Sequence, residues 1–224
     1  MSKQPFKQPF KQPTTPDVVA AFDVDGTLTV RDCVRPFLLR VAGWPGVSRA
    51  ILGRPLAALS AAARCDRDRL KELIVGGVLR GRSVAQVEAM GETFAAQVHD
   101  LWLRSDMIAR LRWHQRAGHR TVLVSASLGP YLHPLGRRLG VDDVLCVEPK
   151  SVDDEFTDQL VDGNCRAAEK VRRLDAWLRD RRLEQATVWA YGDSAGDREL
   201  LNRADNSILV THRLVQAVPA GYES

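Results

Sequence analysis

Five short runs of mainly apolar residues recur along this chain of 224 residues, and they limit its fold more than any other feature. Each is short enough for a strand that is buried on both faces of a parallel sheet. Helical patterns separate the runs: one begins at Ser105 and stops at Gly118, and another places Val171, Leu174 and Leu178 on one face. This alternation predicts an α/β protein with a doubly wound, Rossmann-like parallel sheet. The five runs are residues 18–23, 121–125, 144–147, 187–191 and 207–210.

Polar side chains follow three of these runs, at the point where each strand ends. Asp23 and Asp25 follow the first run. Ser125 ends the second, and Asp193 comes after the fourth. Ligands of a doubly wound sheet bind at the carboxyl ends of the strands. We therefore expect these side chains to belong to one site.

The most specific chemical signal is the segment Asp23-Val24-Asp25-Gly26-Thr27. Both carboxylates can face one pocket if the chain turns sharply, and Gly26 permits such a turn. Two close carboxylates at neutral pH need a cation, and their hard oxygen atoms favour Mg²⁺. Asp pairs of this spacing are common in surface turns, but one directly after a buried strand is far more specific.

The segment between the first and second runs predicts a separate helical unit. Its apolar residues keep helical spacing, and no strand-like run interrupts them. We expect residues 31–104 to form an all-helical cap inserted after the first strand, as a lid over the site. Residues 17–30 and 105–224 are then the α/β core. Residues 3–13 repeat the tetrapeptide KQPF and are too polar and proline-rich to pack, so we expect residues 1–16 to be a disordered tail.

These motifs resemble, in type and order, those of the haloacid dehalogenase (HAD) superfamily. Its first motif, DxDGT, matches residues 23–27. Its second is a Ser or Thr that ends a hydrophobic strand, matched by Ser125, and its third is a Lys near the start of a later helix, matched by Lys170. Its fourth, GDxxxD after a strand, matches residues 192–197. The resemblance covers residues 17 to about 210 and implies a hydrolase.

The resemblance also implies a role for each matched side chain. Asp23 is expected to attack phosphorus and form an aspartyl-phosphate. Asp25 is expected to protonate the leaving oxygen and then to accept a proton from the attacking water. Lys170 places a positive charge on the phosphate, Ser125 donates a hydroxyl hydrogen bond, and backbone amides near Gly26 complete the phosphate site.

The same resemblance implies a magnesium site. The expected ligands are the side chains of Asp23 and Asp193 and the backbone carbonyl of Asp25, together with water. Asp197 is expected to support this metal shell or to orient Lys170.

A helical insertion after the first motif resembles the phosphoserine phosphatase-like branch, subfamily IB. Three positions depart from phosphoserine phosphatases. Those enzymes carry a Glu that holds the substrate ammonium where this chain has Asp32. They have SGG where residues 125–127 are SAS, and Asn-Asp where residues 196–197 are Gly-Asp. We expect Asp32 and Arg35 to contact the substrate.

The expected function is a Mg²⁺-dependent phosphomonoester phosphatase acting on a small phosphorylated metabolite or a phospholipid head group. Phosphoserine phosphatase is the alternative, and a phosphotransferase uses similar residues. A binding module without activity is a third possibility, although no expected catalytic or metal residue is missing. Arg166 competes with Lys170 for the cationic role, and Ser127 competes with Ser125.

The composition narrows the partners. The net charge is +4, but the basic residues are mostly Arg interleaved with Asp and Glu, which favours solvated helix faces over a nucleic-acid site. The positive charge suits an anionic small substrate. Structural zinc is not expected, because the histidines and the four cysteines lack metal-ligand spacing. No apolar run approaches the roughly 20 residues that cross a bilayer, and we expect a cytoplasmic protein. The cysteines are Cys33, Cys65, Cys146 and Cys165.

Overall fold

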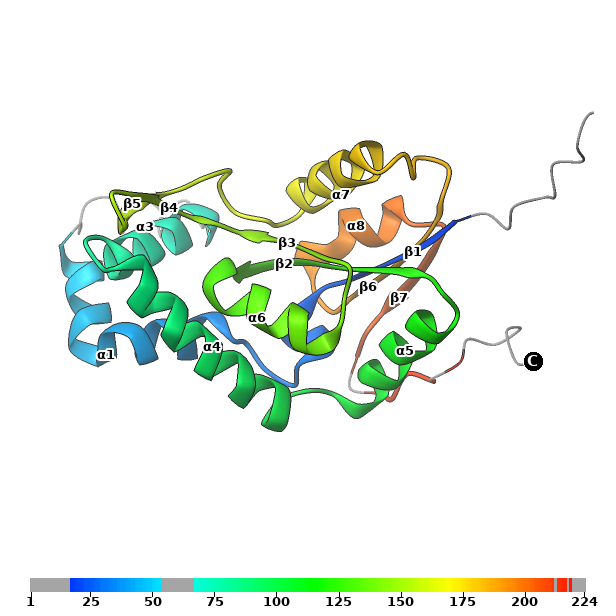
Figure 1. Cartoon of the computed structure of the whole chain (residues 1–224), viewed down its shortest axis with the longest axis horizontal. Helices are drawn as coiled ribbons and strands as arrows, with labels where there is room; N and C mark the ends of the chain where they lie inside the picture. Colours follow the sequence, from blue (N-terminus) through cyan, green and yellow to red (C-terminus); the bar gives the residue numbers. More distant parts are fainter. Residues whose placement is uncertain (1–16, 54–66, 212, 217, 219–224) are drawn as a thin grey trace, which may run out of the picture.

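The computed structural model describes residues 17–53, 67–211, 213–216 and 218 (Figure 1). The predicted disordered tail, residues 1–16, lies outside the described residues. Within them, helices cover both faces of one sheet, and a helical group lies at one end of it.

The main sheet consists of five strands: β1 (Val18–Phe22), β2 (Arg120–Leu128), β3 (Asp143–Val147), β6 (Thr187–Gly192) and β7 (Asn206–Leu209). They lie in the order β3-β2-β1-β6-β7, and each neighbouring pair is parallel. The doubly wound parallel sheet expected from the sequence is therefore confirmed. Because β1 is the central strand, the residues that follow it emerge in the middle of the sheet's carboxyl edge.

Helices on both faces explain why the strands are continuously apolar. Helices α5 (Ser105–Arg116) and α6 (Gly129–Leu139) cover one face, and α7 (Ala168–Asp180) and α8 (Arg198–Arg203) cover the other (Figure 1). Side chains that alternate between the two faces are therefore buried in either direction. Phe22 is fully buried and stacks on Tyr191 of β6, with ring centroids 4.5 Å apart.

Strand β2 is longer than the sequence predicts. The apolar run ends at Ser125, but the strand continues to Leu128, and its pairing with β3 shifts register between Val124 and Leu128. Ser125 and Ser127 therefore both belong to β2.

The described part of the insertion is helical, as expected. It consists of α1 (Val34–Leu52), α3 (Arg67–Leu79) and α4 (Val84–Leu101). Helices α1 and α3 pack against each other, whereas α4 lies along α6 of the core (Figure 1). A Cβ at Gly91 of α4 would lie 2.0 Å from the carbonyl oxygen of Pro130, so only glycine allows this close approach. The boundaries of the cap, residues 31 and 104, stay a prediction.

A small hairpin was not expected from the sequence. Strands β4 (Pro149–Val152) and β5 (Glu155–Leu160) pair antiparallel, and β5 packs against α3. The turn between them is Asp153-Asp154, both with positive φ, which is the conformation of a type I′ turn. Glycine usually occupies one of these positions, so the sequence lacks the signal that predicts such a turn.

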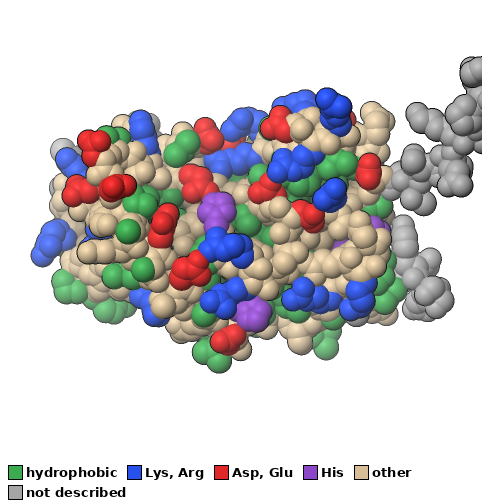
Figure 2. All heavy atoms as spheres, in the orientation of Figure 1, with side chains coloured by type: hydrophobic (Ala, Val, Ile, Leu, Met, Phe, Trp, Pro, Cys, Tyr) green, Lys and Arg blue, Asp and Glu red, His purple; other side chains and the backbone are tan. Residues whose placement is uncertain are grey.

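The charges of the surface are mixed. Figure 2 shows Lys and Arg interspersed with Asp and Glu on the face drawn, without a continuous basic stripe. No helix in the described part of the chain is long and apolar enough to cross a membrane.

Candidate active site

The first site segment leaves β1 at Asp23 and turns back at once. The backbone N–H of Asp23 still donates to the carbonyl of Tyr191, 2.9 Å away, as a last bond of the sheet. Gly26 follows with φ of +83°, a conformation that strains any residue with a Cβ. Thr29 closes the turn by donating its backbone N–H and its hydroxyl to the carbonyl of Val24. Asp23 and Asp25 are thereby held at the carboxyl end of the sheet.

Lys170 joins two acidic residues beneath this turn. Its Nζ lies 2.5 Å from Asp23 Oδ1 and 2.6 Å from Asp197 Oδ1. All three side chains are nearly inaccessible to solvent, at 3%, 8% and 2% exposure for Lys170, Asp23 and Asp197. Burial opposes the charge of Lys170, but the two carboxylates outweigh it and raise the pKa of the amine. Lys170 is therefore cationic throughout the physiological pH range.

Asp197 is held in place from its other side. Its Oδ2 accepts hydrogen bonds from the hydroxyl of Ser194 at 2.8 Å and from the backbone N–H of Ser194 at 3.1 Å. In return, the Ser194 hydroxyl accepts from the N–H of Gly196, 3.2 Å away. This capping box fixes the carboxylate that orients Lys170.

Asp193 follows strand β6 and lies directly beside the first turn. A Cβ at Gly26 would lie 2.2 Å from Asp193 Oδ2, so the turn and this carboxylate can approach only because Gly26 has no side chain. Asp23, Asp193 and Asp197 each offer a carboxylate oxygen, and these three atoms lie within 4.8 Å of one another. Such a set of hard oxygen atoms fits Mg²⁺.

Asp25 has a different environment from Asp23. Its Oδ2 accepts a hydrogen bond of 2.7 Å from the hydroxyl of Ser127, and its Oδ1 accepts one of 2.9 Å from the backbone N–H of Cys33. The Tyr131 hydroxyl donates in turn to Ser127 Oγ, at 2.8 Å. Burial, and then the charge of Asp23, raise the pKa of Asp25 to about 6. A carboxyl group with this pKa can both donate and accept a proton near neutral pH.

The other carboxylates of the site also resist ionisation. Burial raises the pKa of Asp23, although the Lys170 cation opposes the shift. Partial burial and the charges of Asp23 and Asp197 raise the pKa of Asp193 to about 6. A divalent cation among these groups would relieve their mutual repulsion and favour their ionised forms.

Comparison with known proteins identifies the family of this chain. Residues 20–202 match the sequence profile of haloacid dehalogenase-like hydrolases. The chain belongs to the haloacid dehalogenase-like hydrolases. It is also 36% identical over 205 residues to Protein CicA of Caulobacter vibrioides, a match that covers 91% of this chain and 89% of CicA.

Solved structures show the same fold for this haloacid dehalogenase-like hydrolase. A Bordetella pertussis Tohama I protein of unknown function has a TM-score of 0.67 and 24% identity, over 87% of this chain and 90% of that one. A substrate-bound phosphoserine phosphatase has a TM-score of 0.62 and 14% identity, over 88% and 87%. The superfamily expected from the four motifs is confirmed, and the fold is that of its phosphoserine phosphatase-like branch.

The sequence left two choices open in this haloacid dehalogenase-like hydrolase: Lys170 or Arg166 as the cation of the site, and Ser125 or Ser127 as its hydroxyl. Lys170 contacts Asp23, whereas Arg166 lies against Gly196, where an added Cβ would be 3.0 Å from its Nε. Ser125 and Ser127 are both buried, and Ser125 Oγ accepts the backbone N–H of Ser127 at 3.1 Å.

Asp32 and Arg35 lie where helix α1 begins. The Asp32 carboxylate accepts hydrogen bonds from the backbone N–H groups of Val34 and Arg35, at 3.3 and 3.1 Å. The Arg35 guanidinium lies 5.5 Å from the ring centre of Trp44. Both Asp32 and Arg35 line a cavity that also reaches Asp25.

Three residues of the site were not singled out from the sequence. Tyr131 reaches Asp25 through Ser127, as described above. Lys71 of α3 donates to the carbonyl of Ala126, and Asn164 Oδ1 lies 3.3 Å from its Nζ. Thr27 Oγ1 is the one buried side-chain N or O atom in the described residues without a hydrogen-bond partner. Thr27 belongs to the DxDGT motif, whereas no motif or strand end marks Tyr131 or Lys71.

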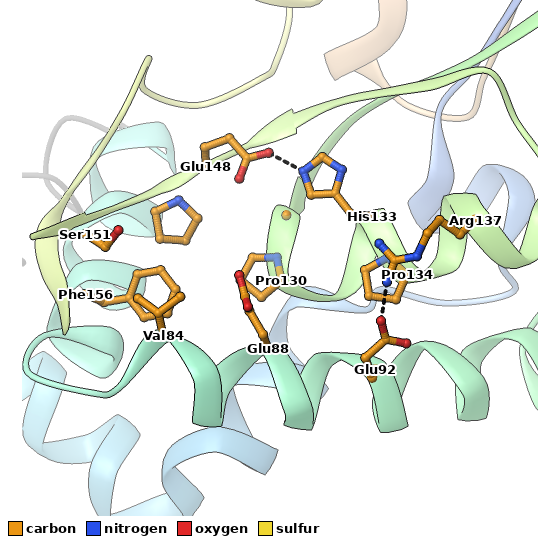
Figure 3. Close-up of a pocket in the computed structure, with 12 residues that line it drawn as sticks. Val84, Glu88, Glu92, Pro130, His133, Pro134, Arg137, Glu148, Ser151 and Phe156 are labelled. Carbon is orange, nitrogen blue, oxygen red and sulfur yellow. Dashed lines mark hydrogen bonds and ion pairs between the residues drawn. The ribbon is translucent and has the colours of Figure 1, made fainter. Parts of the chain in front are cut away.

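A second pocket of about 380 Å³ contains none of the expected catalytic residues (Figure 3). Figure 3 shows His133 bonded to Glu148, and Cys146 donates to the same carboxylate, at 2.7 and 3.0 Å. These three residues have ligand atoms of the kinds that bind Zn²⁺. The sequence did not predict this cluster, because His133 comes from helix α6 and only the fold brings it to the end of β3. Cys65 lies outside the described residues.

Proposed function

We propose that this hydrolase is a Mg²⁺-dependent phosphomonoester phosphatase that works through an aspartyl-phosphate. One observation carries the proposal: two carboxyl groups, two residues apart, lie in different environments. Asp23 is paired with the buried cation of Lys170, whereas Asp25 is held by Ser127 and Cys33 with a pKa of about 6. Such a difference suits a nucleophile beside an acid–base group.

In the proposed first step, a carboxylate oxygen of Asp23 attacks phosphorus and forms an acyl-phosphate bond. The bond between phosphorus and the bridging oxygen breaks, and Asp25 transfers its proton to that oxygen. In the second step, Asp25 removes a proton from water as the water attacks phosphorus. The bond between phosphorus and the Asp23 oxygen breaks, inorganic phosphate leaves, and both carboxyl groups return to their starting states.

The non-bridging oxygens of the phosphate need positive charge and hydrogen-bond donors. Lys170 supplies the charge, and Ser125 supplies a hydroxyl at the same edge of the sheet. The unpaired hydroxyl of Thr27 supports a further contact, because a buried polar atom without a partner costs about 1–3 kcal/mol. Asp197 acts through Lys170, by holding its amine in position.

The donor set around the turn fits Mg²⁺, with Asp23 and Asp193 as side-chain ligands and the backbone carbonyl of Asp25 as a third. When bound, Mg²⁺ supplies positive charge that offsets the charge of the phosphoryl oxygens. The close approach of Gly26 to Asp193 supports this assignment, because it brings the first turn and the fourth motif together.

The proposed substrate is an anionic phosphorylated small molecule or a phospholipid head group, and the proposed location is the cytoplasm. Phosphoserine is the less favoured substrate. Recognition of its ammonium would rest on Asp32, whose carboxylate is already bonded to the start of α1.

Hydrolysis of p-nitrophenyl phosphate tests the proposal. We expect turnover with Mg²⁺, loss of turnover in chelator and recovery when Mg²⁺ is returned. Ca²⁺ should support the reaction poorly, because its longer and looser coordination suits in-line transfer less well. Full activity of a metal-stripped sample would contradict the magnesium assignment, and no turnover with any phosphomonoester would contradict the phosphatase.

The pH dependence of kcat/KM should differ between substrates with different leaving groups. Asp25 donates a proton only when protonated, so kcat/KM for an alkyl phosphate should fall about tenfold per pH unit above the pKa of Asp25. That limb should begin at or below pH 6, since a bound cation lowers the pKa of a neighbouring carboxyl group. p-Nitrophenolate leaves without a proton, so the limb should be weak for p-nitrophenyl phosphate. Identical profiles for both substrates would argue against Asp25 as the acid.

A further inference from the structure

The cavity beside Asp25 is larger and more apolar than a small polar substrate requires. Its volume is about 570 Å³, within the range that holds drug-sized ligands. Helices α1 and α3 form most of its wall, and Ala126 of β2 closes it near the phosphate site. Six of the apolar residues that line it are Val34, Leu38, Trp44, Ile51, Ile74 and Val75.

The cavity meets the proposed chemistry at one point. Asp25 lines the cavity, whereas none of the other expected catalytic and metal-binding residues does. Those residues are Asp23, Lys170, Asp193 and Asp197. In the proposed mechanism, Asp25 protonates the bridging oxygen of the leaving alcohol. The remainder of that alcohol must therefore extend from Asp25 into this cavity.

The other polar residues of the wall have partners within the protein. Asp32 accepts two backbone N–H groups of α1, and the Arg35 guanidinium lies over the Trp44 ring. Lys71 donates to the Ala126 carbonyl and lies 3.3 Å from Asn164 Oδ1. Most of the wall is apolar, so a charged leaving group would lose water against it, which is costly.

We propose that the substrate is a phosphomonoester of an apolar or amphipathic alcohol, whose chain or ring fills this cavity. The proposal rests on the phosphatase function proposed above and names the class of substrate for the same site. Contact with the wall removes apolar surface from water. Each methylene group buried in this way strengthens binding about fourfold.

The test measures kcat/KM for linear alkyl phosphates from ethyl to hexyl, for phenyl phosphate, and for O-phosphoserine. We expect a rise of about 10²-fold from ethyl to hexyl phosphate, with O-phosphoserine at or below ethyl phosphate. Comparison of hexyl with phenyl phosphate distinguishes a cavity for chains from one for rings. Alkylphosphonates, which have no bridging oxygen to cleave, should show the same order as inhibitors.

Two variants distinguish the effect of a polar group in the cavity wall from a general effect of the substitution on the fold. Ile74→Asn puts an amide into the wall, whereas Leu101→Asn makes the same kind of change at the end of α4, where Leu101 is 70% exposed and outside the cavity. Ile74→Asn should reduce the ratio of hexyl to ethyl turnover at least tenfold, and Leu101→Asn should leave that ratio unchanged. Because both substrates are measured on the same sample, this ratio does not depend on the fraction of the enzyme that is folded.

Acetyl phosphate, a small activated phosphate, distinguishes the two ways of failing. Turnover of acetyl phosphate together with a flat alkyl series, or with a preference for O-phosphoserine, would overturn the apolar-alcohol proposal and leave the phosphatase intact. Absence of turnover with acetyl phosphate and every ester would overturn both.

Discussion

Asp23→Asn should lower kcat for p-nitrophenyl phosphate by at least about 10⁴-fold, because the amide keeps the shape of the carboxylate but cannot attack phosphorus. The measurement is steady-state hydrolysis by freshly prepared enzyme, with mass spectrometry to exclude deamidation back to Asp. A matched control is Asp142→Asn, which removes a carboxylate at the opposite end of the sheet, where it pairs with Arg120. The control should keep its activity.

The same variant should not be less stable at pH 7. Burial raises the pKa of Asp23, so its contribution to stability is present below its unfolded pKa of 3.8 and is lost as pH rises through the folded value. The carboxyl group of Asp23 is therefore harder to ionise in the metal-free fold than in the unfolded chain, and a neutral amide removes that penalty. An inactive variant with an unchanged or higher Tm fits the nucleophile assignment. Residual turnover above about 1% would contradict that assignment, and a collapsed fold would contradict the predicted effect on stability.

Lys170→Met should have the largest effect on stability. The substitution leaves the carboxylates of Asp23 and Asp197 buried without their cation, a loss that typically costs 3–5 kcal/mol. For a chain of this size that corresponds to a fall in Tm of roughly 6–20 °C. Thermal and urea unfolding of metal-free protein at pH 7 would measure it. Turnover should also be lost, because the phosphate loses its fixed positive charge.

A second substitution tests the physical reason. Asp197→Asn removes one of the two buried carboxylates that Lys170→Met leaves without a cation. The Lys170→Met/Asp197→Asn double variant should therefore recover part of the lost stability. Lys150→Met is the matched control, because Lys150 is exposed and its side chain bonds to Gln159 and to no other residue among the contacts described. It should change the free energy of unfolding by no more than about 0.5 kcal/mol. Equal losses in the Lys170 and Lys150 variants would rule out the buried ion pair as the cause.

The sequence predicts the sheet well because both faces of its strands are covered. A strand buried on two faces must be apolar throughout, and such a run is visible without any structure. The hairpin of β4 and β5 carries no comparable signal: its turn, Asp153-Asp154, lacks the usual glycine, and most of its residues are exposed. The end of β2 was also placed too early, because Ala126 and Ser127 interrupt the apolar run that β2 continues to Leu128.

Candidate catalytic residues were predictable for a related reason. Asp23, Asp25, Ser125 and Asp193 stand at the carboxyl ends of apolar runs, and strand ends of a parallel sheet meet at one edge. Lys170 was inferred from the resemblance alone, and its contact with Asp23 spans 147 residues of chain. No local pattern distinguishes it from its charged neighbours on α7.

The sequence by itself determined the α/β class, the order of the four motifs and the membership of the family, because these depend on local apolar runs and on the types of residues that end them. Tertiary structure alone decided that Asp32 bonds to helix α1, that Ser127 rather than Ser125 contacts Asp25, and that an apolar cavity reaches the same carboxyl group. Those properties arise where α1, α3 and β2 come together. Local periodicity cannot specify the distance between elements that are far apart along the chain, and packing of the whole fold sets it.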